Sequence, residues 1–298
     1  MIRPFAAGAR VLEAVPLSGG LRNTNYRLRL SSLPEPVVLR LFSADPSACR
    51  REAALQRLVG GRVPVPEVLY SQPEADPPWN VVAWIKGERF DQVLTTAGHA
   101  ELGAMSRDAG RVLARIHAFT FPAAGFLGPD LSVGAFDGYS GDWSEMLNAW
   151  LLHGRSGTRL GPELTERLLL FVADNAHRMK PLGAQAHLLH SDYKPWNLLV
   201  RGPEVAAVLD WEFAFSGWPL NDIGIYLRHS ASLPPAYLDG FIDGYLDAGG
   251  DLPDDWRRLA RLIDLISLCY FLERPEEDPA VVRDVRPLIE TTLSDFAR

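Results

Sequence analysis

The stretch His190-Ser191-Asp192-Tyr193-Lys194-Pro195-Trp196-Asn197 decides the fold, together with Asp210-Trp211-Glu212 further along the chain. Apolar segments at 187–190, 198–200 and 205–209 flank these residues, and the last two enclose a Gly-Pro turn that predicts a hairpin. Polar groups therefore stand at both ends of apolar strands. Asp192 can accept or orient a hydroxyl proton, whereas Asn197 and Asp210 offer the hard oxygens that Mg²⁺ prefers. The pattern predicts a phosphoryl-transfer site.

The spacing H-x-D-x-x-x-x-N, followed by an Asp at a strand end, resembles the catalytic loop and metal-binding Asp of protein-kinase-like enzymes. In detail it is similar to the aminoglycoside phosphotransferase and choline kinase family, which commonly shows HGDxxxxN and then IDWE…G.P..D. This chain has HSDYKPWN and then LDWEFAFSGWPLND. The resemblance extends over the whole chain. It implies an α+β, protein-kinase-like two-lobed fold, with a small antiparallel β N-lobe containing one helix and a larger, mostly helical C-lobe.

The resemblance also implies a role for each residue of the two motifs. Asp192 matches the catalytic base, and His190 matches the residue that braces the catalytic loop. Asn197 and Asp210 match the Mg²⁺ ligands. Lys194 matches the Lys that meets the transferred phosphate in many protein kinases, whereas many relatives in this family have His there.

Weaker matches to the family lie nearer the N-terminus, in residues 18–26. Gly19, Gly20 and Asn23 match its GG..N..Y turn over the ATP phosphates, although a Gly-Gly pair between strands is more often only a hairpin turn. In the catalytic loop, Ser191 stands where the family usually has Gly, which removes freedom at positive φ but leaves the backbone path intact.

A strand and the helix after it carry a second set of candidates for the nucleotide site. Arg40 stands where protein kinases place a Lys, and its partner would be Glu52. Such a pair would hold a cation against the α- and β-phosphates, whereas without the catalytic motifs an exposed Arg and a solvated Glu would be the simpler interpretation. The resemblance makes the segment 81–86 a hinge in which Val82, Trp84 and Ile85 lie near adenine. The choice between ATP and GTP stays open.

Periodicity divides the chain into a β-rich part and a helical part. Hairpin strands are predicted at 26–30 and 37–42, a helix capped by Asp45 runs to residue 59, and further strands follow at 64–70 and 79–85. Helices are predicted at 101–117, 143–152 and 162–179, and again from about 222, 235, 253 and 279. We therefore expect an N-terminal nucleotide-binding lobe at 1–86 and a C-terminal lobe with the catalytic loop and substrate site at 87–298.

Composition narrows the class of protein further. The 298 residues are 47% hydrophobic and 22% charged, which is typical of globular domains, and the net charge of −7 argues against binding to nucleic acid or to an anionic membrane. Only two cysteines occur and they are far apart, so a reducing cytoplasm is expected. The N-terminus lacks a signal-peptide core, and the apolar stretch 262–272 is too short to span a bilayer.

Several further residues have both a structural and a functional interpretation. Glu212 either touches metal or substrate or is simply paired, and Asp222 is either a helix N-cap or a substrate contact. The i+4 row of acidic residues on one predicted helix is better explained as a solvated face than as a site for a cationic substrate. A parallel aromatic row and the histidine that ends the first long helix are best explained as structural; these residues are Asp239, Asp243, Asp247, Tyr237, Phe241, Tyr245 and His117.

The sequence therefore predicts a Mg²⁺-dependent enzyme that moves the γ-phosphoryl group of ATP to a hydroxyl of a small molecule. The acceptor stays open among aminoglycoside-like antibiotics, amino alcohols, homoserine and sugar-like compounds, and no obligatory protein partner is indicated. The alternative is a non-catalytic nucleotide-binding pseudokinase or scaffold. Loss of the catalytic base or of a metal ligand would support that alternative, but Asp192, Asn197 and Asp210 are all present. Only residues 211–221 separate Asp210 from Asp222, too few for the activation segment of a protein kinase.

Overall fold

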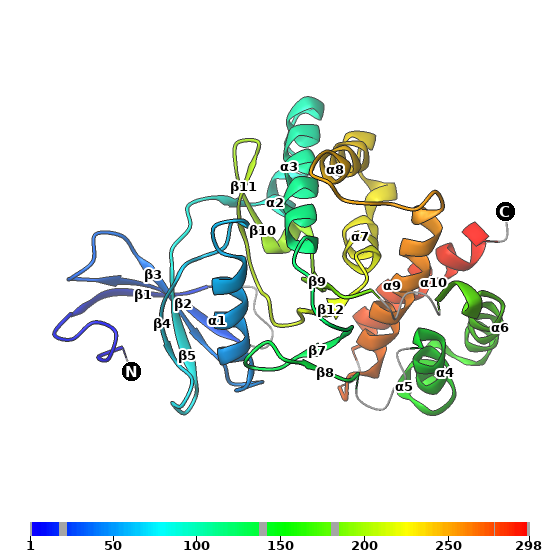
Figure 1. Cartoon of the computed structure of the whole chain (residues 1–298), viewed down its shortest axis with the longest axis horizontal. Helices are drawn as coiled ribbons and strands as arrows, with labels where there is room; N and C mark the ends of the chain where they lie inside the picture. The colour runs from blue at the N-terminus through cyan, green and yellow to red at the C-terminus, as the bar shows by residue number, and fades with distance from the viewer. Residues whose placement is uncertain (1, 18–22, 137–141, 180–184, 277, 297–298) are drawn as a thin grey trace.

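The structure is a computed structural model that describes residues 2–17, 23–136, 142–179, 185–276 and 278–296. Figure 1 shows the strands and single helix of the N-terminal part on one side of the molecule, and the helices of the C-terminal part on the other. The predicted α+β two-lobed fold is confirmed. The exact boundary at residue 86 stays a prediction.

The N-lobe is built on a five-stranded antiparallel sheet in the order β1-β2-β3-β5-β4. The predicted hairpin is confirmed as β2 and β3, and its register places Asn25 opposite Arg40. The sequence does not predict β1, because Glu13 and Pro16 interrupt its apolar residues. The strands are β1 (Val11–Leu17), β2 (Thr24–Leu30), β3 (Val37–Leu41), β4 (Val68–Gln72) and β5 (Trp79–Ala83).

Helix α1 (Ala48–Val59) packs against β4 and β5 and brings a buried carboxylate, Glu52, to the sheet. The prediction that Asp45 caps this helix is wrong, because Ser47 occupies the N-cap position. Asp45 instead closes a turn before the helix, where its Oδ1 accepts the backbone N–H of Ser47 at 3.1 Å. Local side-chain bonding by Asp thus competes with helix initiation.

Two small sheets of the C-lobe position the predicted catalytic loop, residues 190–197. One has the order β8-β7-β12-β9 and the other has the order β11-β10-β6. Residues 190–197 connect β9 in the first sheet to β10 in the second, and the β10–β11 hairpin then returns the chain to Asp210. The strands are β6 (Glu88–Arg89), β7 (Gly125–Leu127), β8 (Val133–Gly134), β9 (His187–Leu189), β10 (Leu198–Arg201), β11 (Glu204–Val208) and β12 (Phe215–Gly217).

The helices predicted from periodicity are confirmed to within a few residues, whereas the sequence gives no signal for the short α2 and α5. The C-lobe helices are α2 (Phe90–Val93), α3 (His99–His117), α4 (Trp143–His153), α5 (Arg155–Leu160), α6 (Pro162–Met179), α7 (Leu220–Leu227), α8 (Pro235–Asp247), α9 (Trp256–Glu273) and α10 (Pro279–Phe296). The apolar stretch 262–272 lies in α9 and is largely buried. Within the described ranges, no helix is both long and apolar enough to cross a membrane.

Helices α3 and α8 pack against each other (Figure 1). At Gly110 and Gly244 an added Cβ would overlap a backbone oxygen of the opposite helix, of Phe241 and Arg107 respectively. The aromatic row on α8 is part of the core, as predicted: the ring centroid of Phe241 lies 3.8 Å from that of Tyr226 on α7. The α3–α8 pair is therefore a close-packed unit behind the catalytic loop.

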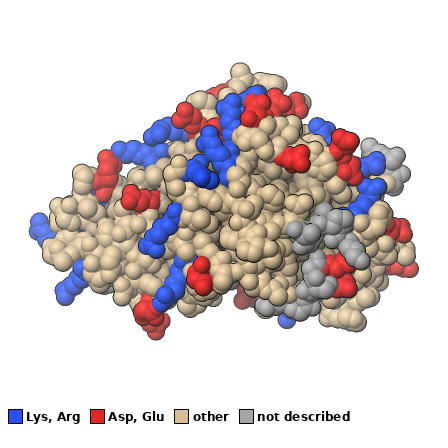
Figure 2. Space-filling view, in the orientation of Figure 1, with Lys and Arg blue, Asp and Glu red and all other residues tan. Residues whose placement is uncertain are grey.

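The acidic row on α8 is a solvated face, as predicted, since Asp239, Asp243 and Asp247 are all exposed, and two of the three form ion pairs. Arg107 of α3 donates from Nη1 to Asp243 at 3.2 Å and from Nη2 to Asp247, so these two carboxylates pair across the two helices. Figure 2 shows basic and acidic side chains side by side along the upper edge of the molecule, over these helices. Since all of these side chains are partly exposed, we assign the ion pairs only a small contribution to stability.

Candidate active site

The catalytic loop presents Asp192 with both carboxylate oxygens engaged. Lys194 Nζ lies 2.7 Å from Asp192 Oδ1, and the side-chain amide of Asn197 donates to Asp192 Oδ2 at 2.7 Å. The same amide also donates to the backbone carbonyl of Asp192 at 3.0 Å. Because its NH₂ group is used in this way, Asn197 has its carbonyl oxygen left to serve as a metal ligand.

His190 braces the loop from inside the core. It is fully buried, its Nδ1 accepts the backbone N–H of Asp192 at 3.3 Å, and its Nε2 lies 2.9 Å from the carbonyl oxygen of Leu209. A carbonyl can only accept, so Nε2 carries the proton. His190 thus joins the backbone of Asp192 to the residue that precedes Asp210.

Asp222 of α7 holds the backbone of the loop. Its two oxygens accept the backbone N–H groups of His190 at 2.8 Å and Ser191 at 2.6 Å. Ser191 has a φ of +61°, which turns consecutive N–H groups toward one carboxylate. The prediction of Asp222 as an N-cap is wrong, because Pro219 takes that position and Asp222 lies inside the first turn of α7.

The β10–β11 hairpin returns the chain to Asn197 at the residue before Asp210. The backbone N–H of Leu209 donates to the carbonyl oxygen of Asn197 at 2.8 Å. Asp210 itself has a φ of +63°, so the backbone bends sharply at this residue. Carboxylate oxygens of Glu52, Asp210 and Glu212 all lie within 4.8 Å of one another. Hard oxygens gathered so closely fit a divalent cation.

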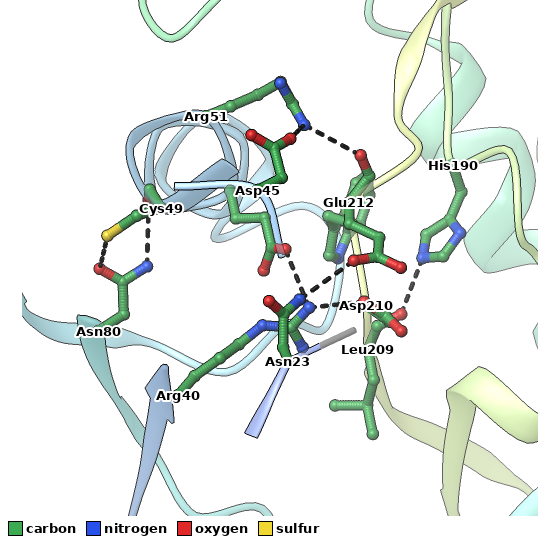
Figure 3. A network of polar contacts seen from close by, with 12 residues as sticks. Asn23, Arg40, Asp45, Cys49, Arg51, Asn80, His190, Leu209, Asp210 and Glu212 are labelled. Atoms are coloured by element: carbon green, nitrogen blue, oxygen red, sulfur yellow. Dashed lines mark hydrogen bonds and ion pairs between the residues drawn. The ribbon is translucent and has the colours of Figure 1, made fainter. Parts of the chain in front are cut away.

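The guanidinium of Arg40 lies among these carboxylates, as Figure 3 shows. Arg40 Nη2 donates to Glu52 at 2.9 Å and to Asp210 at 2.7 Å. Burial opposes the charge of Arg40, but Glu52 and Asp210 outweigh it and raise its pKa. Burial raises the pKa of Glu52 to about 7 although Arg40 acts in the opposite direction. Within the described part of the chain, Arg40 Nε has no partner, so the residue retains a donor for a phosphate oxygen.

Other contacts join the N-lobe to Glu212 (Figure 3). The side-chain amide of Asn23 donates to Glu212 Oε2 at 3.1 Å, and Arg51 Nη2 donates to the carbonyl oxygen of Glu212 at 3.2 Å. The structure therefore brings Asn23, Arg40 and Glu52 to one place, opposite Asp210 and Glu212. The predicted phosphate-binding residues Gly19 and Gly20 lie outside the described residues.

Comparison with known proteins fits this arrangement. The model of the phosphotransferase enzyme family matches residues 13–262, which is most of the chain and includes both motifs. The chain belongs to this phosphotransferase family. No curated protein sequence matches it, so the family assignment rests on the family model.

Solved structures share the fold of this phosphotransferase. A thermostable mutant of aminoglycoside phosphotransferase APH(4)-Ia, in a ternary complex with ADP and hygromycin B, superposes with a TM-score of 0.74 at 17% identity, over 100% of this chain and 97% of that one. The gentamicin complex of APH(2")-IIa gives a TM-score of 0.68 at 20% identity, over 98% and 93%. The streptomycin–ATP–APH(2")-IIa complex gives 0.64 at 18% identity, over 96% and 94%.

The predicted hinge of the phosphotransferase lies where β5 leaves the N-lobe sheet. Val82 pairs with Val38 and Val68 and is buried, and the chain then passes through Trp84 and Ile85 before β6 begins. The guanidinium of Arg27 lies over the Trp84 ring, 5.6 Å from its centroid. These residues connect the two lobes, which is the position the adenine assignment requires, although their contact with a nucleotide stays a prediction.

Sequence reasoning missed a buried chain of hydrogen bonds beneath the loop of the phosphotransferase. His117 Nδ1 lies 2.9 Å from the hydroxyl of Tyr245, and its Nε2 lies 3.1 Å from Asp222 Oδ2. Burial lowers the pKa of His117, although the bond to Asp222 acts in the opposite direction. The neutral ring therefore donates to Asp222 and accepts from Tyr245. Nothing in the sequence pairs these residues, because they come from three separate helices.

Proposed function

We propose that this chain transfers the γ-phosphoryl group of ATP, with Mg²⁺, to a hydroxyl group of a small molecule. The observation that carries the proposal is the convergence of Asp192, Asn197 and Asp210 with the Arg40–Glu52 pair. A base, metal-binding oxygens and a phosphate-binding cation are the parts that phosphoryl transfer needs, since catalysis depends mostly on positioning and charge neutralisation.

Each residue has a role that follows from its position. Asp192 orients the acceptor hydroxyl and takes its proton as the oxygen attacks phosphorus, and Lys194 lies close enough to neutralise charge on the transferred group. Arg40 binds phosphate oxygens of the nucleotide. Asn197 and Asp210 would hold Mg²⁺, which supplies charge neutralisation at the phosphates.

The acceptor is proposed only as a class. Related structures contain hygromycin B, gentamicin or streptomycin, which supports a hydroxyl-bearing small molecule. Aminoglycoside-like antibiotics, amino alcohols, homoserine and sugar-like compounds all belong to that class. Related structures with ADP, AMP-PNP or ATP support an adenine nucleotide as donor, with GTP as the competitor to test.

The cell compartment is a separate proposal. Both cysteines are buried free thiols, and burial raises the pKa of Cys49 to about 11 and that of Cys269 to about 12. Thiols in this state neither form a disulfide nor react readily. These features support a reducing compartment such as the cytoplasm.

The test is nucleotide consumption by the purified protein across a panel of acceptors, with ATP and GTP compared. The panel contains aminoglycosides, macrolides, amino alcohols, hydroxy amino acids and sugars. We expect one acceptor class to stimulate turnover, and Asp192→Asn to lower kcat about 100- to 10,000-fold because it removes the general base. Mg·ADP binding to this variant should stay intact. Nucleotide binding without turnover in any arm would favour the pseudokinase, and full activity of Asp192→Asn would refute the assignment.

A further inference from the structure

An exposed aromatic ring lies in the predicted catalytic loop, beside a proposed metal ligand. Trp196 is 43% exposed, whereas the next residue, Asn197, is buried. Both belong to the 3₁₀ turn Pro195–Asn197, and successive side chains of such a helix diverge by about 120° because it has three residues per turn. Trp196 therefore leaves the loop in a different direction from Asn197.

Arg89 covers one face of the Trp196 ring. Its Cζ lies 3.5 Å from the ring centroid, which is a close cation–π contact. Asp91 accepts hydrogen bonds from Arg89 Nε at 3.0 Å and from Arg89 Nη2 at 2.8 Å, and such a two-bond pair fixes the plane of the guanidinium. Within the described part of the chain, Arg89 Nη1 makes no hydrogen bond. The side chain is 25% exposed, so Arg89 keeps a donor in a set orientation that a ligand can reach.

Strand pairing places Arg89 on the face of its sheet that is turned away from the C-lobe core. Arg89 lies opposite Leu199 in the β6–β10 register, and Glu88 lies opposite Val200. Because side chains alternate along a strand, Arg89 and Leu199 share one face, whereas Glu88 and Val200 share the other. Val200 is buried in the C-lobe core, and Leu199 is only half-buried. The contact between Arg89 and Trp196 therefore lies outside that core.

The two partners come from segments that a bound nucleotide would connect. Arg89 follows the predicted hinge 81–86 by three residues, and Trp196 directly precedes Asn197. The hinge is predicted to contact the base, and Asn197 is proposed to hold the metal ion at the phosphates. In every nucleotide the sugar joins the base to the phosphates, so a nucleotide bound at both places carries its ribose past the point where these segments meet. That point is the Arg89–Trp196 contact.

We propose that Arg89 determines specificity for the sugar of the donor nucleotide: its Nη1 donates to a ribose hydroxyl oxygen, and Trp196 and Asp91 hold the guanidinium in place for that bond. The inference rests on the proposed function and deepens it, because it names the group that selects a ribonucleotide. A ribose hydroxyl accepts from a guanidinium N–H, whereas a sugar without that hydroxyl leaves the donor unpaired. Arg89 thus distinguishes nucleotides that carry the same base and the same charge.

The experiment is calorimetric titration of the full chain, in the presence of Mg²⁺, with ADP and with 2′,3′-dideoxy-ADP. The two ligands differ only in the sugar hydroxyls, so the ratio of their affinities isolates the contribution of these groups. We expect the unaltered chain to bind ADP about 10-fold more tightly, and Arg89→Met to reduce this preference to about 2-fold or less. Arg201→Met is the matched control, since it makes the same change at an exposed position of β10, and it should retain the preference.

Trp196→Leu tests whether the ring positions the guanidinium. This variant should also lower the preference for ADP, and adding Arg89→Met to it should cause no further loss of preference. A merely structural role would weaken the binding of both ligands by the same factor and leave their ratio unchanged. That result, a further loss in the double variant, or equal affinity of the unaltered chain for the two ligands overturns the inference. If the unaltered chain binds neither ligand, the proposed function fails and this inference fails with it.

Discussion

Arg40 Nη2 lies 2.7 Å from Asp210 Oδ1, so the cation proposed to bind phosphate is paired with the carboxylate proposed to bind metal. The same nitrogen also donates to Glu52 at 2.9 Å. One guanidinium therefore links β3, α1 and the segment after β11. When nucleotide binds, Arg40 has to share its donors among two carboxylates and the phosphates.

This arrangement predicts different costs for single and double substitutions at Arg40 and Glu52. Arg40→Met leaves Glu52 buried with its cationic partner removed, and should lower the free energy of unfolding by about 3–5 kcal/mol. Arg40→Met with Glu52→Gln removes the second charge and should recover most of that loss. Urea unfolding at neutral pH measures both changes. Equal stability of the single and the double variant would contradict the assigned pairing.

The positive φ of Ser191 predicts a stabilising substitution in the catalytic loop. A non-glycine residue at positive φ lowers the stability of the folded protein by about 1–2 kcal/mol. Glycine avoids this loss, but its greater freedom in the unfolded chain offsets part of the gain in stability. Ser191→Gly should therefore raise stability by about 0.5–1 kcal/mol. Its kcat should stay unchanged, because the backbone N–H to Asp222 remains. Ser191→Ala keeps the Cβ and serves as control, and should leave stability within about 0.5 kcal/mol.

His117 predicts a stability loss at acid pH. Its pKa in the folded protein lies below the ordinary 6.5, so the unfolded chain binds the proton more readily. The neutral ring contributes fully to the free energy of unfolding above about pH 6.5. This contribution is lost as the pH falls below that value, by at most about 1.4 kcal/mol per pH unit. His117→Gln lacks this group. Urea unfolding between pH 7.5 and 5.5 should show the stability difference between the unaltered chain and this variant shrink as pH falls; a constant difference would be inconsistent with a neutral buried ring.

The α3–α8 contact predicts opposite effects of the same substitution at two helical glycines. A Cβ at Gly244 would overlap the carbonyl oxygen of Arg107, so Gly244→Ala should lower stability by about 1–3 kcal/mol or more. A Cβ at Gly103 would lie 3.6 Å from that of Ala236, an ordinary contact. Gly103→Ala should be neutral or stabilise the protein by up to about 1 kcal/mol. Thermal and urea unfolding distinguish the pair, and a loss of equal size in both variants would refute the packing argument.

The catalytic motifs and the long helices could be predicted from the sequence because their signals are local. Period and spacing locate α3 and α6, and the polar residues at strand ends locate Asp192, Asn197 and Asp210. Short elements such as β7, β8 and β12 carry no period, because they are two or three residues long and are fixed by pairing with distant strands.

The contacts that complete the site could not be predicted, because each depends on tertiary structure. Asp222 has the sequence context of a cap, and only the approach of the loop to α7 shows that it binds backbone N–H groups. Similarly, Asp243 and Asp247 form an i+4 acidic row in the sequence, whereas Arg107 pairs them from another helix. The contact of Glu212 with Asn23 could not be predicted either, because the two residues are far apart in the chain.

The catalytic loop is attached to the α3–α8 unit rather than to the outer helices. Tyr193 of the loop is buried and donates from its hydroxyl to the carbonyl oxygen of Ala109 on α3, at 2.8 Å, and Tyr226 stacks on Phe241 of α8. Helices α4, α5 and α6 pack mainly with one another and with α9 and α10. Mutations can therefore accumulate in those outer helices while the reacting groups keep their geometry.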